Sequence, residues 1–239
     1  MSRLGVSLTW LGHNGFHVAH PAGPTLVFDP WLGNPKAPPN AQGLVADASL
    51  MLLTHAHWDH ITDTPALANR HQMTVLAQLE LAEEMVAAGI PEARVIGFNI
   101  GGTATLPGLR ATLVQAMHSS SIGPAGGPSR AVGTPTGFVV AYDDGPIIYN
   151  TGDTGVFGDM ALIAELYRPD ILMLPIGDFY TMGARQAAKA VELVDPTWIV
   201  PQHYDTFAGL PGTLEAFRDE LAPSYRDRVI AGPPGRVMS

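Results

Sequence analysis

Residues 54–60 read Thr-His-Ala-His-Trp-Asp-His and end a short apolar run that predicts a strand over Leu50–Thr54. Such a run is typical of a strand buried on both faces of a sheet. Three imidazoles and one carboxylate at the end of this strand are costly to bury unless a partner satisfies them. Because clusters of histidine and acidic side chains bind metal ions, the segment predicts a metal site.

The spacing within this segment bears on the number of ions. In an extended chain, the side chains of His55, His57 and Asp59 share one face, and His60 points elsewhere. A tight loop at the strand end can aim His55 and His57 at one point, and Asp59 and His60 at a second. Two neighbouring metal ions need that arrangement, and imidazole with carboxylate suits zinc, manganese, iron or nickel. The alternative is an exposed loop with chance histidines, since the chain has nine.

Three later residues extend the pattern, because His118, Asp153 and His203 each follow a predicted strand. Taken alone, each has an ordinary explanation as a loop histidine, a turn-capping aspartate or a polar residue at a strand end. Together with residues 54–60, in this order, they resemble the signature of the metallo-β-lactamase superfamily. The resemblance implies an α/β fold of the four-layer αββα sandwich type, with the metal ions at one edge of two facing sheets.

The resemblance also implies which residues hold which ion. Two ligand sets are expected, His55, His57 and His118 for the first ion and Asp59, His60 and His203 for the second. Asp153 is expected to bridge the two divalent ions, of which zinc is the first choice, with manganese, iron and nickel as alternatives. A hydroxide shared by the ions is the expected nucleophile. The resemblance therefore implies a hydrolase of a small ester, lactone or phosphoester.

Four further stretches narrow the resemblance to a bacterial and archaeal subgroup of metal-dependent hydrolases that is related to the ascorbate-6-phosphate lactonases. These stretches are Trp10–His13, Gly152–Met160, Pro175–Gly183 and Gln202–Phe207. The chain departs from the subgroup at Asp178, where a second glycine is expected. That change can alter the wall of the pocket, so the substrate of a relative does not transfer directly.

Five residues are candidates for catalysis or substrate binding. Asp59 is expected to orient the hydroxide and to pass a proton to the leaving group, while His13 binds substrate, acts as an acid or only closes a turn. Arg130 meets an anionic group by bidentate contact or stays solvated. Tyr180 and Tyr204 line the pocket or belong to the core. His13 and Asp59 are the predicted catalytic pair, and the other three are weaker candidates for substrate binding.

Three rival functions remain open on the sequence. The first is a di-iron oxidoreductase module of the same fold, although the chain ends too soon for a fused flavodoxin. The second is a β-lactamase, which commonly uses a cysteine at the second metal, whereas this chain has none. The third is a catalytically silent domain that keeps its metals as a scaffold. Metal content and turnover would separate these alternatives.

Composition limits the partners and the location. The net charge is -9, and the sequence shows no cluster of basic residues that would form a face for nucleic acid. We therefore expect a small-molecule substrate instead. No apolar run is long enough to span a membrane, and Met1–Trp10 does not resemble a signal peptide. The absence of cysteine fits the reducing cytoplasm. Charged residues are only 15%, which permits self-association as a homo-oligomer.

Each half of the chain is predicted to contain a set of strands followed by strands that alternate with helices, which suits two sheets packed face to face with helices outside. No linker divides the chain, which predicts one domain over residues 1–239. The sequence Asp-Asp-Gly at residues 143–145 predicts a hairpin turn. Ser119–Pro135, rich in glycine, proline and serine, is expected to be a loop. Five helices are expected, over Thr64–Arg70, Leu79–Ala88, Phe157–Tyr167, Gly183–Val194 and Gly212–Leu221.

Overall fold

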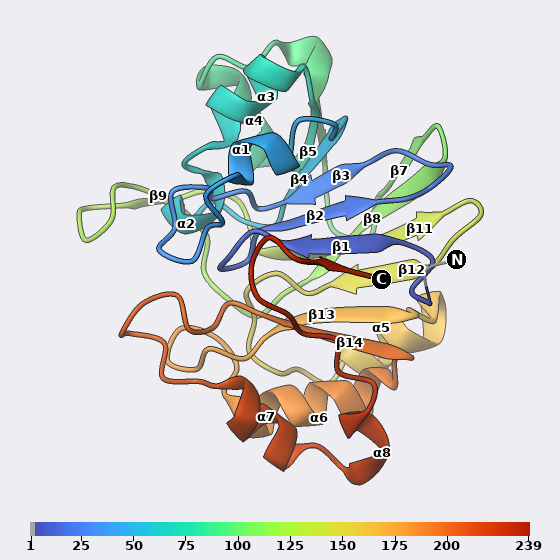
Figure 1. The fold of residues 1–239 in the computed structure, drawn as a ribbon. Coiled ribbons are helices and arrows are strands. Elements are labelled where there is room, and N and C mark those ends of the chain that lie inside the picture. The colour runs from blue at the N-terminus through green and yellow to red at the C-terminus, as the bar shows by residue number, and fades with distance from the viewer. Residues whose placement is uncertain (1–2) are drawn as a thin grey trace.

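Two mixed sheets pack face to face in the computed structural model, which describes residues 3–239 (Figure 1). Helices α3 (Thr64–His71) and α4 (Leu79–Ala87) cover the outer face of one sheet. Helices α5 (Met160–Tyr167) and α6 (Ala184–Val194) cover the outer face of the other. This arrangement confirms the predicted four-layer αββα sandwich of the α/β class.

The first sheet has seven strands in the order β15-β1-β2-β3-β4-β5-β6. The strands are β1 (Ser7–Trp10), β2 (Phe16–Ala19), β3 (Leu26–Phe28), β4 (Leu50–Leu53), β5 (Thr74–Gln78), β6 (Val95–Phe98) and β15 (Val237–Met238). Strands β3 to β6 run parallel, with helical crossovers between β4 and β5 and between β5 and β6. β4 is buried along its whole length, as the apolar run predicts for a central parallel strand.

The second sheet has six strands in the order β14-β13-β12-β11-β8-β7. The strands are β7 (Thr103–Leu106), β8 (Leu109–Gln115), β11 (Thr136–Tyr142), β12 (Ile147–Asn150), β13 (Ile171–Pro175) and β14 (Trp198–Gln202). β11 and β12 pair antiparallel around Asp143–Gly145, which confirms the predicted hairpin. β12, β13 and β14 are parallel, so their carboxyl ends meet at one edge of the sheet.

All five predicted helices are present among residues 3–239, with ends that differ by a few residues. The fifth predicted helix is α7 (Leu214–Glu220), and the helices that were not predicted are α1 (Ala41–Leu44), α2 (Trp58–Ile61), η1 (Glu92–Arg94) and α8 (Pro223–Arg226). Thr213 caps α7, since its Oγ1 accepts a hydrogen bond of 3.1 Å from the amide of Ala216. No helix in the described part of the chain is long and apolar enough to cross a membrane.

A single apolar cluster joins the inner faces of the two sheets. Phe28 of β3 and Phe138 of β11 meet there with ring centroids 6.3 Å apart, and both side chains are fully buried. A second cluster lies between the first sheet and its helices and includes Met51 and Leu67. Because the main cluster draws on both sheets, it supports the proposal of one domain over residues 1–239, of which residues 1–2 lie outside the described part.

Three local features differ from the expectations. The predicted loop over Ser119–Pro135 contains a two-stranded hairpin of β9 (Ser121–Ile122) and β10 (Arg130–Ala131). β2 and β15 were not predicted, and β15 is only two residues long. Residues 58–61, expected as part of a tight loop, form one helical turn, α2. These elements are too short to give a periodic pattern, and β15 also depends on pairing with β1 at the other end of the chain.

Candidate metal centre

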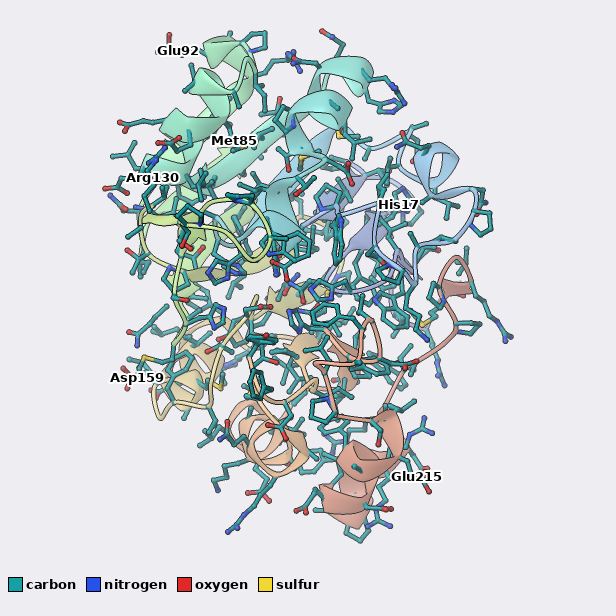
Figure 2. All side chains as sticks on the ribbon, turned by 90° about the vertical axis from the view of Figure 1, so that its left-hand side faces the viewer. His17, Met85, Glu92, Arg130, Asp159 and Glu215 are labelled. Carbon is teal, nitrogen blue, oxygen red and sulfur yellow. The ribbon has the colours of Figure 1, made fainter. Side chains whose placement is uncertain are left out.

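The residues predicted as metal ligands gather at one edge of the two sheets. His55 and His57 follow β4, Asp153 follows β12 and His203 follows β14, each at the carboxyl end of a parallel strand. Ligand sites in sheets with parallel strands commonly lie outside these carboxyl ends. The edge faces the side of the molecule where α2 lies in Figure 1, and Figure 2 views the molecule from that side.

The first group of donor atoms belongs to His55, His57 and His118, and these atoms all lie within 4.8 Å of one another. Nε2 of His55 is 2.9 Å from Nδ1 of His57. Two ligands of a tetrahedral zinc ion stand about 3.3 Å apart, given zinc–nitrogen bonds of about 2.0 Å. Nδ1 of His55 lies 3.0 Å from the hydroxyl of Thr54, which leaves Nε2 to face the group. The three imidazoles therefore fit one cation.

The carboxylate of Asp153 lies between this first group and the remaining histidines. Its Oδ2 is 3.7 Å from Nε2 of His118 and 3.9 Å from Nε2 of His55. The same oxygen is 3.0 Å from Nε2 of His203 and 3.4 Å from Nε2 of His60. One carboxylate oxygen thus faces imidazoles of both predicted ligand sets, which is the geometry that a bridging ligand requires.

The second group comprises His13, Asp59, His60 and His203, again with donor atoms within 4.8 Å of one another. Asp59 Oδ2 is 3.9 Å from Nε2 of His203. Within the described residues, His60 Nε2 and Asp153 Oδ1 are buried without a hydrogen-bond partner. Buried lone pairs that share a small space are costly unless a cation satisfies them, so this donor set fits a second divalent ion.

Burial and mutual charge fix the protonation states of these groups. Burial lowers the pKa of His55, His57 and His118, and neighbouring imidazoles lower it further. Burial opposes ionisation of Asp153, but His203 and His60 outweigh that effect and bring its pKa well below the usual value. Neutral imidazole and ionised carboxylate are the forms that bind metals. The site therefore favours ligand-competent states near neutral pH.

His60 is the exception among the imidazoles. Burial lowers its pKa, but the carboxylates of Asp153 and Asp29 outweigh burial and raise the pKa well above the usual value. A positive charge is therefore favoured at Nε2 of His60, between two carboxylates. A metal ion at this nitrogen meets the same demand for positive charge as a proton does.

No role for Asp29 was predicted from the sequence, although its carboxylate contacts Thr54 and His60, the first and last residues of the ligand segment. Its Oδ2 accepts hydrogen bonds from His60 Nδ1 at 2.9 Å and from Thr54 Oγ1 at 2.7 Å. Its Oδ1 accepts from the Thr54 amide at 2.9 Å, and Asn14 Nδ2 donates to Oδ2 at 2.9 Å. Such outer carboxylates orient metal-ligating imidazoles. The only signal in the sequence is an aspartate before proline at the end of a strand.

We expect Asp29→Asn to weaken binding of the second ion by about 10–100-fold, because an amide cannot accept from His60 and Thr54 as a carboxylate does. Isothermal titration calorimetry of the metal-free protein with zinc measures the affinity for the second ion. The matched control is Asp47→Asn, since Asp47 binds His17 at 2.8 Å on the surface, away from the site. Equal affinities for Asp29→Asn and the control would contradict an orienting role.

His13 lies behind Asp59. Its Nε2 is 3.0 Å from Asp59 Oδ2, and its Nδ1 is 3.0 Å from Thr206 Oγ1. Its backbone φ is 53°, in the left-handed region, and its carbonyl accepts from the amide of His203 at 3.0 Å. The side chain is fully buried, and it does not line the cavity above the metal site. His13 therefore contacts Asp59 and not the space for substrate.

A cavity of about 460 Å³ opens above the ligands. Its walls contain Trp58, Ser119, Tyr180 and Phe207, of which only Tyr180 was predicted. The volume is that of an ordinary small-molecule pocket. Trp58 lies within the predicted metal-binding segment 54–60, so its position near the ions could have been inferred from the sequence. No local pattern identifies Ser119 or Phe207 as wall residues.

The two other predicted substrate residues are not in the wall. Arg130 points to Glu84, with Nη2 2.5 Å from Oε2, and its side chain is 61% exposed. Tyr204 stacks on Trp10 with ring centroids 5.1 Å apart and is buried. Their distance from the wall follows from contacts with elements far away in the sequence. A direct role for either residue in substrate binding has no support in this geometry.

Asp178, where the resemblance to the subgroup led us to expect glycine, adopts φ 63°, and Phe179 follows with φ 56°. Glycine enters this left-handed region without steric cost, and aspartate is among the residues that tolerate it. Asp178 Oδ1 accepts a hydrogen bond of 2.8 Å from the amide of Phe179, which stabilises the turn. Asp178 is exposed and does not line the cavity, so the expected change in the pocket wall is not seen at this residue.

Two facing mixed sheets with a histidine–aspartate cluster at one edge define the class of metallo-β-lactamase-type proteins. The chain belongs to the beta-lactamase superfamily, because the family model described as "Beta-lactamase superfamily domain" matches residues 24–204. It is 44% identical over 235 residues to a UPF0173 metal-dependent hydrolase of Herpetosiphon aurantiacus, covering 98% of this chain and 97% of that relative.

Solved structures agree with this family. The metallo hydrolase Igni18 of Ignicoccus hospitalis superposes with a TM-score of 0.86 at 33% identity, covering 98% of this chain and 97% of that one. An isothiocyanate hydrolase from Delia radicum gut bacteria has a TM-score of 0.76 at 19% identity, covering 98% of both chains, and shows the fold alone. The protein is therefore an enzyme of the metal-dependent hydrolase class.

Proposed function

We propose that this enzyme binds two divalent metal ions and hydrolyses a small ester, lactone or phosphoester. The observation that carries the proposal is the position of Asp153 Oδ2, between 3.0 and 3.9 Å from imidazoles of both ligand sets. His55, His57 and His118 would hold one ion, and Asp59, His60 and His203 the other. Zinc is the ion we propose first, with manganese, iron or nickel as alternatives, since all accept imidazole and carboxylate.

The bound ions would supply a hydroxide nucleophile near neutral pH and polarise the scissile carbonyl or phosphoryl group. Asp59 lines the cavity, so its carboxylate can orient the attacking group and carry a proton to the leaving group. Since the neighbouring His13 and His60 outweigh the effect of burial and lower the pKa of Asp59, the carboxylate is ionised and can accept that proton.

His13 is proposed as a positioning residue that acts through Asp59. Burial and the nearby His203 lower its pKa to about 4, so the ring is neutral at pH 7. A neutral ring has one N–H, and Nε2–H can donate to Asp59 Oδ2 at 3.0 Å while Thr206 faces Nδ1. This contact holds the carboxylate in one orientation. The predicted roles of His13 in binding substrate or acting as a direct acid have no supporting contact.

Metal analysis combined with turnover tests the proposal and its rivals. We expect about two zinc ions per chain, and hydrolysis of at least one member of an ester, lactone and phosphodiester panel that stops after chelation and returns with zinc. Activity that survives complete metal removal contradicts the proposal. Two bound ions without any turnover would favour a catalytically silent domain. Bound iron with oxygen consumption would favour the di-iron alternative.

Further expectations about partners and location also stay proposals. We propose a small-molecule substrate, no nucleic-acid partner, a cytoplasmic location and self-association as a homo-oligomer. The net charge of -9 supports the first two, because it disfavours polyanions. Light scattering coupled to gel filtration would measure the oligomeric state.

A further inference from the structure

The charged groups in the wall of the cavity above the ligands bear on the choice of substrate. Its wall contains two carboxylates, Asp59 and Asp153, and no lysine or arginine. Two divalent ions would carry four positive charges, and these two carboxylates offset half of them. Sites that transfer phosphoryl groups commonly add arginine or lysine clamps for the remaining phosphate oxygens. This wall offers no such clamp.

Cations near the cavity are bound elsewhere. Arg130 lies on the hairpin whose turn forms part of the wall, but it pairs with Glu84 at 2.5 Å on the outside. Lys36 pairs with Asp205 at 2.7 Å. Neither Arg130 nor Lys36 lines the cavity. The net charge of -9 on the chain also repels anions from a distance. Apart from the proposed ions, the wall therefore offers no cationic side chain that could bind a charged group of the substrate.

The rest of the wall is aromatic and hydroxylic. Trp58 of α2, Tyr180 after β13 and Phe207 after β14 contribute aromatic rings from three separate segments. Trp58 is held by an edge contact to Trp31 with ring centroids 4.8 Å apart. Such rings bury apolar groups of a ligand at low entropic cost.

Serine hydroxyls make up the uncharged polar part of the wall. Ser119, Ser121 and Ser129 line the cavity on the segment that contains β9 and β10. Neutral hydroxyls can donate to a carbonyl or ether oxygen but do not compensate a full negative charge. The polar groups of this wall therefore match an uncharged oxygen-containing ligand.

We infer that the substrate is an uncharged carboxylic ester or lactone, with an apolar group that packs on Trp58, Tyr180 and Phe207. The inference rests on the proposed hydrolytic function. In the reaction, the oxygen of water bonds to the carbonyl carbon and the bond from that carbon to the alkoxy oxygen breaks. One proton of the water goes to the alkoxy oxygen, and the products are a carboxylic acid and an alcohol, or a hydroxy acid from a lactone.

Two esters that share a leaving group test the effect of charge. 4-Nitrophenyl hexanoate and the 4-nitrophenyl monoester of adipic acid have the same acyl chain length, but the second ends in a carboxylate. With zinc-loaded enzyme, we expect kcat/KM for the hexanoate to exceed that for the adipate by at least about 10-fold, a difference of about 1.4 kcal/mol. An equal or higher value for the adipate overturns the inference and leaves the proposed function intact.

Reaction class is tested with phosphate esters of the same leaving group. Rates are divided by the rate with hydroxide alone, because carboxylic esters are intrinsically more reactive. We expect a higher rate enhancement for the hexanoate than for bis(4-nitrophenyl) phosphate, and the reverse order overturns the inference. Metal-dependent turnover of none of these compounds overturns the proposed function and the inference together.

A charge introduced into the wall provides a matched variant. Ser129→Lys adds a cation to the wall, and Ser224→Lys adds one at an exposed position on α8, outside the wall. We expect Ser129→Lys to reduce the preference for the hexanoate over the adipate by at least 5-fold, an electrostatic effect of about 1 kcal/mol. Ser224→Lys should leave that preference unchanged. The same preference in both variants would show that the wall does not select by charge.

Discussion

Asp153→Asn is expected to lower the metal content from two ions per chain to one or none, and to reduce kcat/KM by about 10³-fold or more. The reason is that Oδ2 of Asp153 faces His55, His60, His118 and His203 at 3.0 to 3.9 Å. An amide has the same shape but no negative charge, so two cations would repel each other across it. Elemental analysis after gel filtration measures the ion content.

The fold of this variant is expected to stay intact, because asparagine preserves the volume of the side chain. Circular dichroism checks this point. Asp170→Asn serves as the control, since Asp170 is an exposed aspartate whose Oδ2 accepts from the amide of Ile147 at 2.8 Å. The control should keep both ions and full activity. Two retained ions with unchanged turnover in Asp153→Asn would refute the bridging role.

Complete removal of metal is expected to lower the melting temperature of the enzyme by about 10 °C. An ion at a thousand times its Kd stabilises the folded state by about 4 kcal/mol. For chains of this size, each kcal/mol shifts Tm by about 2–4 °C. The bare site also leaves buried donors such as His60 Nε2 and Asp153 Oδ1 without a partner. Differential scanning calorimetry before and after dialysis against a chelator measures the shift.

Zinc added back should restore the original Tm, and magnesium at the same concentration should not, because imidazole ligands select zinc. Asp153→Asn provides a second control. Because this variant should hold fewer ions, chelation should lower its Tm by less than half as much as it lowers the Tm of the unchanged enzyme. The expectation fails if Tm stays within 2 °C of its starting value while elemental analysis reports no residual metal.

The chemistry of the site was already present in the order of residues along the chain. The apolar run before His55 predicted a buried strand, and the imidazoles and carboxylate that end it predicted metal binding. The turn residues Asp143–Gly145 predicted the hairpin, whereas the α/β sandwich was implied by the resemblance to the superfamily. Side-chain type and periodicity are local properties, which is why one sequence sufficed for these conclusions.

The convergence of donors was decided by tertiary structure. His118, Asp153 and His203 come from separate strand ends, and only the strand order and register bring them within hydrogen-bonding range of one another or nearly so. Asp29, which orients His60 from β3, has no local signature, since its role depends on a contact across 31 positions. Long-range packing sets such contacts, and a single sequence does not encode them as a pattern.

The same division applies to the substrate. The sequence of this protein determined the ligand types, because these follow from local residue type and spacing, and its resemblance to the superfamily implied the fold that carries them. Tertiary structure alone turned Arg130 toward Glu84, buried His13 behind Asp59 and brought Trp58 and Phe207 into one wall. The physical reason is that a side chain's direction depends on which distant residues pack around it.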